Sequence, residues 1–238
     1  MRILSFSKFN ESEDSSRTYS FDELSPEAQE TALESYRDIN TDYNDWHDPI
    51  IEGFIEDMME EFGVDIGTED IFYTGFYSQG DGASFKGTVD DEEKFFKNAL
   101  SLKSSEFLDM GDEEKSDDEE LVTLMGDLRN IGFDNRERLK PEDFYIQFTK
   151  SSSRYEHSNT MDIDVEVDEI EEEDDDERYF KSFISKIESE SLDWARGKAD
   201  ELYSSLSRYY EELQKDDAVK EAILDNDYQF DEEGNPSN

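Results

Sequence analysis

Hydrophobic and charged positions alternate along one short stretch of the chain, MDIDVEVD at residues 161–168. Four apolar side chains are separated there by the carboxylates of Asp162, Asp164, Glu166 and Asp168. Because successive side chains of a β-strand point to opposite faces, this period of two predicts a strand with one buried face. The four carboxylates would then form a single outward row.

Other stretches also carry strand patterns. Residues 71–89 contain two aromatic and β-branched runs on either side of a Gly-Asp-Gly turn at 80–82, which predicts a hairpin. Residues 144–153 and 161–170 form a second candidate pair, joined by a polar connection. Four strands in two pairs indicate an antiparallel sheet.

Two helices are predicted in the first quarter of the chain. One is expected over about residues 26–39, where apolar residues recur at helical spacing, Ser25 can cap the first turn and Pro26 fits the first helical position. A second follows Pro49 and ends near Gly63. We expect these two helices to pack together as a pair.

The last third of the chain predicts a long helix. Apolar residues recur every three or four positions from about 179 to 214, and shorter helices are expected near 94–102 and 218–224. Together with the strands, these helices predict an α+β fold in which a small antiparallel sheet packs with several helices, including the long C-terminal one.

The domain organisation is expected to be simple. We predict a polar N-terminal segment at 1–20, one α+β domain at 21–224, and a polar C-terminal tail at 225–238. Within the domain, charged residues concentrate in acidic runs at 111–120 and 169–177. No internal repeat of fixed period is present.

The charge of the chain is far more negative than solubility requires. Sixty-seven acidic residues against 23 basic ones give a formal charge of −44, while 34% hydrophobic residues suffice to build a core. Such a polyanion repels nucleic acids and anionic membranes, whose binding needs clustered Lys and Arg. We therefore expect basic proteins or cations as partners, and no direct binding to nucleic acid or membrane.

Compartment and oligomeric state are less constrained. The chain has no cysteine, which removes disulfides and thiolate metal sites, and no run of about 18 apolar residues that could span a membrane. Its first 16 residues lack the apolar core of a signal peptide. We predict a soluble cytoplasmic protein, and the sequence does not indicate its oligomeric state.

The densest negative charge lies at 162–177, where twelve of sixteen residues are acidic. Carboxylates spaced at roughly 6.7 Å along one strand have a lower charge density than duplex DNA, which carries one phosphate charge about every 1.7 Å of its axis. The acidic runs and the acidic helix faces would bring the density closer to that of DNA. The candidate partner-binding residues are Asp162, Asp164, Glu166, Asp168, Glu169, Glu171, Glu172, Glu173, Asp174, Asp175, Asp176 and Glu177.

Patterns for catalysis are weak. His47 and His157 do not stand at a metal-ligand spacing such as HExxH, and no segment matches a calcium-binding loop. The triplets at 92–94 and 113–115 contain the E-x-K pair used by some metal-dependent nucleases, but in so acidic a chain they arise readily by chance. Aromatic residues at 72–85 are expected to pack the hairpin rather than to stack bases. We predict no enzymatic activity, no cofactor and no metal site.

Several segments resemble a widespread family of uncharacterised tailed-bacteriophage proteins. They are GFYSQGDGASFKG (75–87), FDELSPEAQETALESYRDINTDYNDWHDPIIEGF (21–54), SRYEHSNTMDIDVEV (153–167) and KDDAVKEAILDNDYQFDEEG (215–234). The SQGDGASF string is the most specific of them. The resemblance implies a phage origin but brings no activity or catalytic residue with it, and the acidic runs depart from the family pattern.

A carboxylate-rich phage protein is similar in its surface to phage DNA mimics that act against host defence. We therefore predict a nucleic-acid mimic that, in the host cytosol, binds and inhibits a basic DNA- or RNA-binding host protein such as a defence nuclease, a restriction complex or a CRISPR effector. A virion structural or head-packaged protein that binds basic phage proteins is the alternative, and the N-terminal SFSKFNES resembles the leader of proteins packaged in phage heads. An antitoxin-like regulatory binder, a merely solvated surface and halophilic adaptation also remain open.

Overall fold

The computed structural model of the chain describes residues 17–43, 45–100, 141–167 and 177–237. Helices and antiparallel strands form its secondary structure, which confirms the predicted α+β class with a long C-terminal helix. The acidic run predicted at 111–120 lies outside the described residues.

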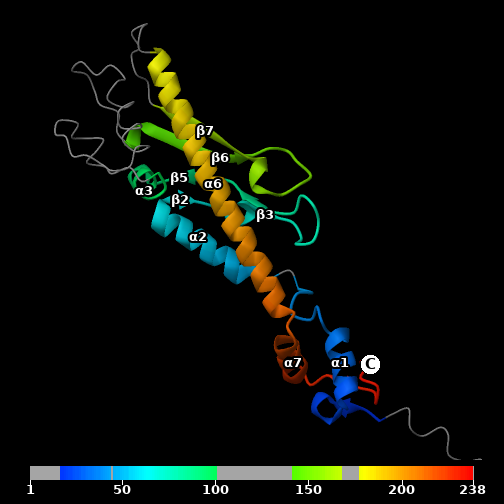
Figure 1. Ribbon diagram of the computed structural model, residues 1–238. Helices are drawn as coiled ribbons and strands as arrows, with labels where there is room; N and C mark the ends of the chain where they lie inside the picture. Colours follow the sequence, from blue (N-terminus) through cyan, green and yellow to red (C-terminus); the bar gives the residue numbers. More distant parts are fainter. Residues whose placement is uncertain (1–16, 44, 101–140, 168–176, 238) are drawn as a thin grey trace, which may run out of the picture. The chain divides into compact units, whose positions relative to one another are not determined.

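The chain divides into two compact units. The smaller unit combines the chain up to His47 with the chain from Arg208 onward, and the larger unit runs from Asp48 to Ser207. Each unit has a hydrophobic core of its own. The units are therefore described one at a time, with the labels of Figure 1.

Four antiparallel strands form the main sheet of the larger unit, in the order β2-β5-β6-β7. The strands are β2 (Val64–Asp65), β5 (Gly87–Val89), β6 (Phe144–Lys150) and β7 (Met161–Val167). β6 and β7 pair along their whole length of seven residues. Their apolar positions share one face, which confirms the period of two seen in the sequence.

A short hairpin adjoins this sheet. β3 (Ile71–Tyr73) and β4 (Ala83–Phe85) pair antiparallel on either side of a loop, as predicted. Gly80 in this loop has a φ of +97°, which residues with a side chain rarely adopt, and a Cβ there would lie 2.9 Å from the ring of Tyr155. The turn expected at 80–82 therefore needs glycine both for its backbone and for its close contact.

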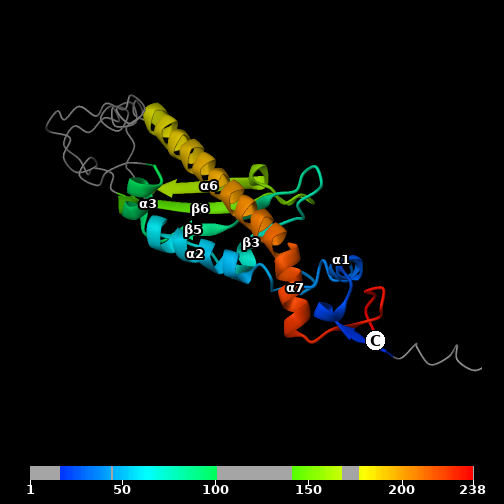
Figure 2. The same cartoon turned by 60° about the horizontal axis from the view of Figure 1, so that its bottom comes forward.

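Helices α2 (Asp48–Phe62), α3 (Glu92–Asn98) and α6 (Glu177–Leu213) supply the rest of the larger unit, and Figure 2 shows α6 crossing the sheet. The apolar face of the sheet packs against these helices. The ring centroid of Phe148 lies 6.0 Å from those of Phe95 and Trp194. The buried helical residues of this core are Met58 of α2, Phe95 and Phe96 of α3, and Ile187, Ala195 and Ala199 of α6. The opposite face of β6 and β7 is not covered by these helices.

The smaller unit is built from both ends of the chain. β1 (Tyr19–Ser20) pairs antiparallel with β8 (Gln229–Phe230), and α1 (Pro26–Ser35) packs against α7 (Asp216–Asp225). The Oγ of Ser25 accepts a hydrogen bond from the N–H of an α1 residue, which confirms the predicted cap. The last turns of α6, from Arg208, also belong to this unit.

The predicted polar tail at 225–238 is structured where it carries aromatic residues. Phe230 is fully buried, and its ring lies 6.4 Å from that of Phe21 and 5.8 Å from that of Tyr36. The ring of Tyr228 packs against the same Tyr36, tilted by 33°, with centroids 4.6 Å apart. The tail is polar in composition, but two rings and a strand fix it to the N-terminal part of the chain.

The pairing expected between the first two helices would join the two units and stays a prediction. α1 shares its core with Val219 and Ile223 of α7, whereas Met58 of α2 belongs to the core of the larger unit. Both helices have an apolar face, but an apolar face does not specify its partner. The single domain predicted for 21–224 stays a prediction.

Candidate partner-binding surface

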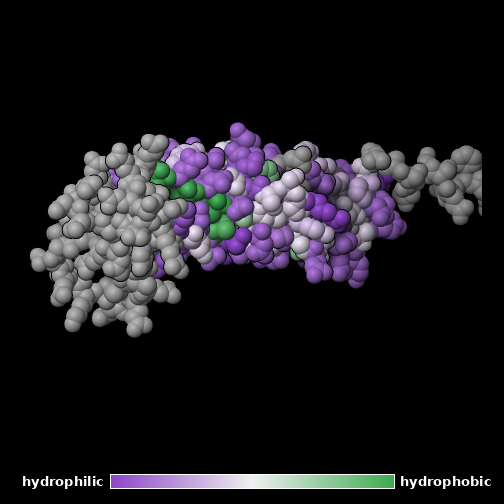
Figure 3. All heavy atoms as spheres, turned by 90° about the horizontal axis from the view of Figure 1, so that it is seen from above, coloured by the Kyte–Doolittle hydropathy of each residue, from purple (hydrophilic) through white to green (hydrophobic). Residues whose placement is uncertain are grey.

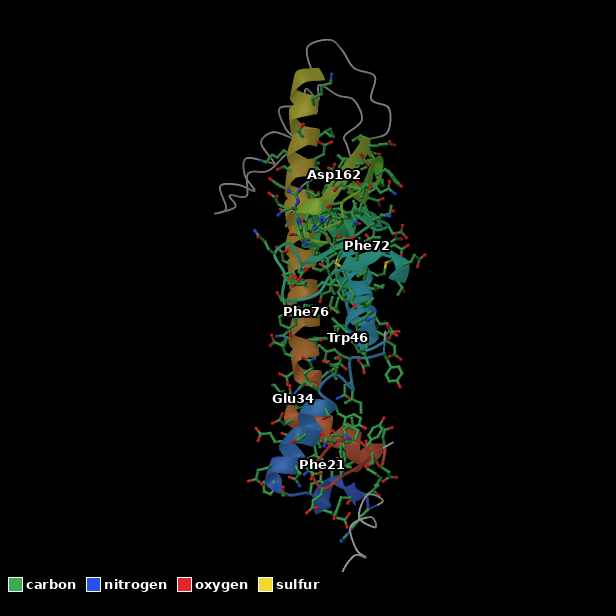
Figure 4. The ribbon with its side chains drawn as sticks, turned by 90° about the vertical axis from the view of Figure 1, so that its right-hand side faces the viewer. Phe21, Glu34, Trp46, Phe72, Phe76 and Asp162 are labelled. Atoms are coloured by element: carbon green, nitrogen blue, oxygen red, sulfur yellow. The ribbon has the colours of Figure 1, made fainter. Side chains whose placement is uncertain are left out.

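The carboxylates of Asp162, Asp164 and Glu166 lie on β7 and are exposed to solvent; they are called the acidic row below. The residues between them, Ile163 and Val165, are partly buried against the core of the larger unit. Asp162 is labelled in Figure 4. Three of the four carboxylates of the outward row expected from the sequence are therefore present on β7, and their role in binding stays a prediction.

No basic side chain neutralises the acidic row within the described part of the chain. The ion pairs formed there by Lys and Arg involve other carboxylates. The residues that face the row across β6 are neutral: they are Thr149, Gln147 and Tyr145. Neighbouring carboxylates roughly 6.7 Å apart in water repel by about 0.6 kcal/mol per pair. Within the described residues, the carboxylates of the row are therefore not engaged in an ion pair.

Negative charge also lies at the opposite edge of the same face. Asp65 of β2 is exposed and stands in register with Thr88 of β5, Gln147 of β6 and Asp164 of β7. Three strand spacings separate the two carboxylates, which is about 14 Å. The outer face of the sheet is therefore acidic at both edges and neutral and polar between them.

Tyr145 adds an aromatic group to this face. Its side chain is 46% exposed and stands directly opposite Glu166 of the acidic row. Partly exposed tyrosines are frequent energetic centres of protein interfaces, because they bury a large rigid ring at small entropic cost. The sequence analysis missed Tyr145, although its outward position follows from the alternation of β6. Figure 3 shows hydrophilic residues over most of the visible surface, with a strip of hydrophobic residues beside the grey atoms.

The outer edge of β7 is held at its start by two contacts. A guanidinium nitrogen of Arg196 in α6 donates to the carbonyl oxygen of Met161 at 3.1 Å. The backbone N–H of Ile163 donates to Oδ1 of Asp162 at 3.0 Å. Both backbone groups point away from β6, because Thr160 bonds to Ser151 in the same ladder and the bonding side alternates along the strand.

The other predicted contact residues are not placed by the structure. Glu177 is the first residue of α6. The remaining ones lie outside the described residues: they are Asp168, Glu169, Glu171, Glu172, Glu173, Asp174, Asp175 and Asp176.

The hairpin loop forms a second ordered surface. Oδ2 of Asp81 accepts hydrogen bonds from the backbone N–H groups of Tyr77 and Ser78, and the hydroxyl of Tyr203 donates to the carbonyl of Gly75 at 3.0 Å. Burial, and then the nearby charge of Asp81, raise the pKa of Tyr203. The hairpin rings pack as expected except for that of Tyr77, which is 78% exposed.

The histidines have structural surroundings. Nδ1 of His157 accepts from the N–H of Asn159 at 3.2 Å and so caps the 3₁₀ turn Ser158–Thr160. His47 lies edge-on to Trp46 with ring centroids 5.5 Å apart. Over residues 17–43, 45–100, 141–167 and 177–237, no group of three or more His, Asp or Glu side chains is arranged to hold a metal ion.

A comparison with protein families matches residues 46–216 to a family described as a domain of unknown function, DUF8835. The chain belongs to this family. The matched region contains the main sheet, the acidic row and the whole of α6, whereas α1, β1 and β8 lie outside it. No curated protein and no solved structure matches the chain. Among the described helices, none is long and apolar enough to cross a membrane.

Proposed function

We propose that this protein is an acidic binding protein of tailed-phage origin that occupies the nucleic-acid-binding groove of a basic host protein and thereby inhibits it. The plausible targets are defence nucleases, restriction complexes and CRISPR effectors. The single observation that carries the proposal is the acidic row: three exposed carboxylates on one strand, which form no ion pair among the described residues.

The energetics of the row support a functional role. Its like charges cost stability, and solubility does not require them in a chain of net charge −44. A rigid sheet holds the carboxylates at fixed spacing, so a partner would meet them without first ordering a flexible segment. The cross-strand neighbours of the row on β6 are neutral, so within the described residues its carboxylates have no ion-pair partner that a bound protein would have to displace.

The mechanism would be stoichiometric competition. Lys and Arg side chains that normally contact phosphates would pair with the carboxylates instead, and Arg can grip a carboxylate through two hydrogen bonds. Complementary charge would speed association and make it sensitive to salt. The acidic segments outside the described residues would add to the negative electrostatic potential of the acidic row.

Affinity capture with a matched pair of variants tests this function. The first variant replaces the acidic row by amides (Asp162→Asn, Asp164→Asn, Glu166→Gln). The control makes the same change from carboxylate to amide at Glu52, Glu56 and Glu60. These three residues are exposed on α2 at four-residue spacing and form no ion pair among the described residues. Both variants lose three negative charges, so a difference between them reports position rather than net charge.

The expected result is specific to the row. Wild-type protein and the α2 control should capture one nucleic-acid-binding protein from host lysate at about 0.05 M NaCl and release it at about 0.5 M, while the row variant should capture little. Equal capture by the two variants, or capture only of virion proteins, would contradict the proposal.

A further inference from the structure

We propose that the free edge of β7 accepts an extended basic segment of the partner as a fifth, antiparallel strand of the main sheet. This inference rests on the proposed function and names the part of the partner that the acidic row recognises. It is carried by backbone groups of this edge strand that are unpaired within the described residues, which lie beside the acidic row but are a separate feature of the molecule.

The register shows which backbone groups face the free edge. In an antiparallel pair, the N–H and C=O groups of one residue both point to the same side, and this side alternates along the strand. The carbonyl of Met161 and the N–H of Ile163 both point outward, since Arg196 and Asp162 bind them there. The outward set therefore consists of the odd-numbered residues of β7, and the even-numbered residues bond to β6.

Most of this outward set has no partner. Within the described part of the chain, nothing pairs with the carbonyl of Ile163, with the N–H and C=O of Val165, or with the N–H of Val167. Such a row of donors and acceptors is a template for one more strand. A short segment of the partner could therefore form up to about four backbone hydrogen bonds here.

The side chains of β7 define what the added strand should look like. Residues opposite one another in an antiparallel pair lie on the same face. The added strand would place Arg or Lys opposite Asp164 and Glu166 on the outer face, and apolar residues beside Ile163 and Val165 on the inner face. The occupant is thus an alternating basic and apolar segment. A second copy of β7 would instead set carboxylate against carboxylate, which disfavours self-pairing.

A synthetic peptide provides a defined probe. Acetyl-Arg-Val-Arg-Val-Arg-Val-Arg-amide has the required alternation, and its valine amides would point to β7 while its arginine amides point away. Methylation of two valine amides should weaken binding by about tenfold, because each bond lost contributes a factor of several. Methylation of two arginine amides is the matched control and should leave binding unchanged.

A substitution in β7 tests the same backbone contact by changing the protein instead of the peptide. Val165→Pro removes an outward N–H without removing a bond to β6, and proline is tolerated at such edge positions. It should weaken binding of the unmodified peptide by about tenfold, whereas Val165→Thr, which keeps the N–H, should have little effect. Fluorescence anisotropy measures the affinities, and amide exchange of Val165 in the complex should slow for the unmodified and the arginine-methylated peptides but not for the valine-methylated one.

The outcomes separate the two proposals. Loss of binding on methylation of valine but not of arginine supports strand addition. If binding depends on the acidic row but is indifferent to methylation and to Val165→Pro, strand addition is wrong and the charged surface stands. If the peptide does not bind at about 0.05 M NaCl, or binds the row variant equally well, both proposals are contradicted. Dimerisation of the protein through β7 would also overturn the inference.

Discussion

Replacing Asp164 by Asn is expected to stabilise the larger unit at low ionic strength. Asp164 is the central member of the acidic row, with a like charge two residues away on either side. It forms no ion pair among the described residues, and its cross-strand neighbour is the neutral Gln147. The substitution therefore removes repulsion without removing an attractive partner.

The size of the effect follows from the strand geometry. Two neighbours at roughly 6.7 Å each repel Asp164 by about 0.6 kcal/mol in water, which gives about 1.2 kcal/mol for both. Some repulsion persists in the unfolded chain, so we expect the free energy of unfolding to rise by about 0.5–1 kcal/mol. Asp162→Asn should give less than half this gain, because Asp162 has one such neighbour in the described chain and its Oδ1 accepts a hydrogen bond from the N–H of Ile163 that the charge strengthens.

The two tryptophans allow the larger unit to be measured by itself. Trp194 packs between the rings of Phe62 and Phe95, both at 5.1 Å, and Trp46 lies in the smaller unit. In a Trp46→Phe background, urea unfolding followed by fluorescence therefore reports the core of the larger unit. The measurement is made at about 0.01 M and about 0.5 M NaCl.

Salt dependence provides the decisive control. At about 0.5 M NaCl the screening length falls to about 4 Å, which leaves about a fifth of the repulsion. The gain from Asp164→Asn should then drop below about 0.3 kcal/mol. A substitution that is neutral or destabilising at low salt, or whose effect is independent of salt, would refute the repulsion argument.

The other predictions concern packing, backbone and ionisation. Phe230→Ala should cost the smaller unit about 3–5 kcal/mol, because a fully buried ring is lost, and should shift the unfolding transition seen by Trp46 fluorescence. Gly197→Ala should stabilise α6 by about 1 kcal/mol, since an added Cβ there meets nothing within 4 Å, whereas Gly63→Ala should destabilise by more than about 1 kcal/mol because φ is +67°; urea midpoints test both. Since the pKa of Tyr203 is raised, its neutral phenol contributes stability that is lost as pH rises above 10.0, so Tyr203→Phe should flatten this alkaline loss in a series of urea titrations.

Local patterns in the sequence predicted local structure well. The alternation in MDIDVEV specified both the strand β7 and which of its faces carries carboxylates, because a period of two admits only that arrangement. The cap at Ser25 and the glycine turn at 80–82 were equally local signals, and both are present. Each of these predictions depends on residues within a few positions of one another.

Long-range pairing could not be predicted in the same way. α1 packs against α7, which lies almost at the other end of the chain, and Phe230 is buried although it stands in a polar segment. The position of β7 at the edge of the sheet depends on how β2 and β5 pair. Those strands have two and three residues, too few to show a period. The sequence therefore could not predict that the backbone N–H and C=O of Val165 are unpaired within the described residues.

Displacement of nucleic acid from a captured target tests the central claim most directly. A labelled duplex bound to the purified target would be titrated with wild-type protein, with the acidic-row variant, and with the Glu52, Glu56 and Glu60 control. The account predicts that wild-type protein and the control release the duplex at a one-to-one ratio at low salt, and that the acidic-row variant does not. Binding of the target without release of the duplex, or equal release by the acidic-row variant, would contradict it.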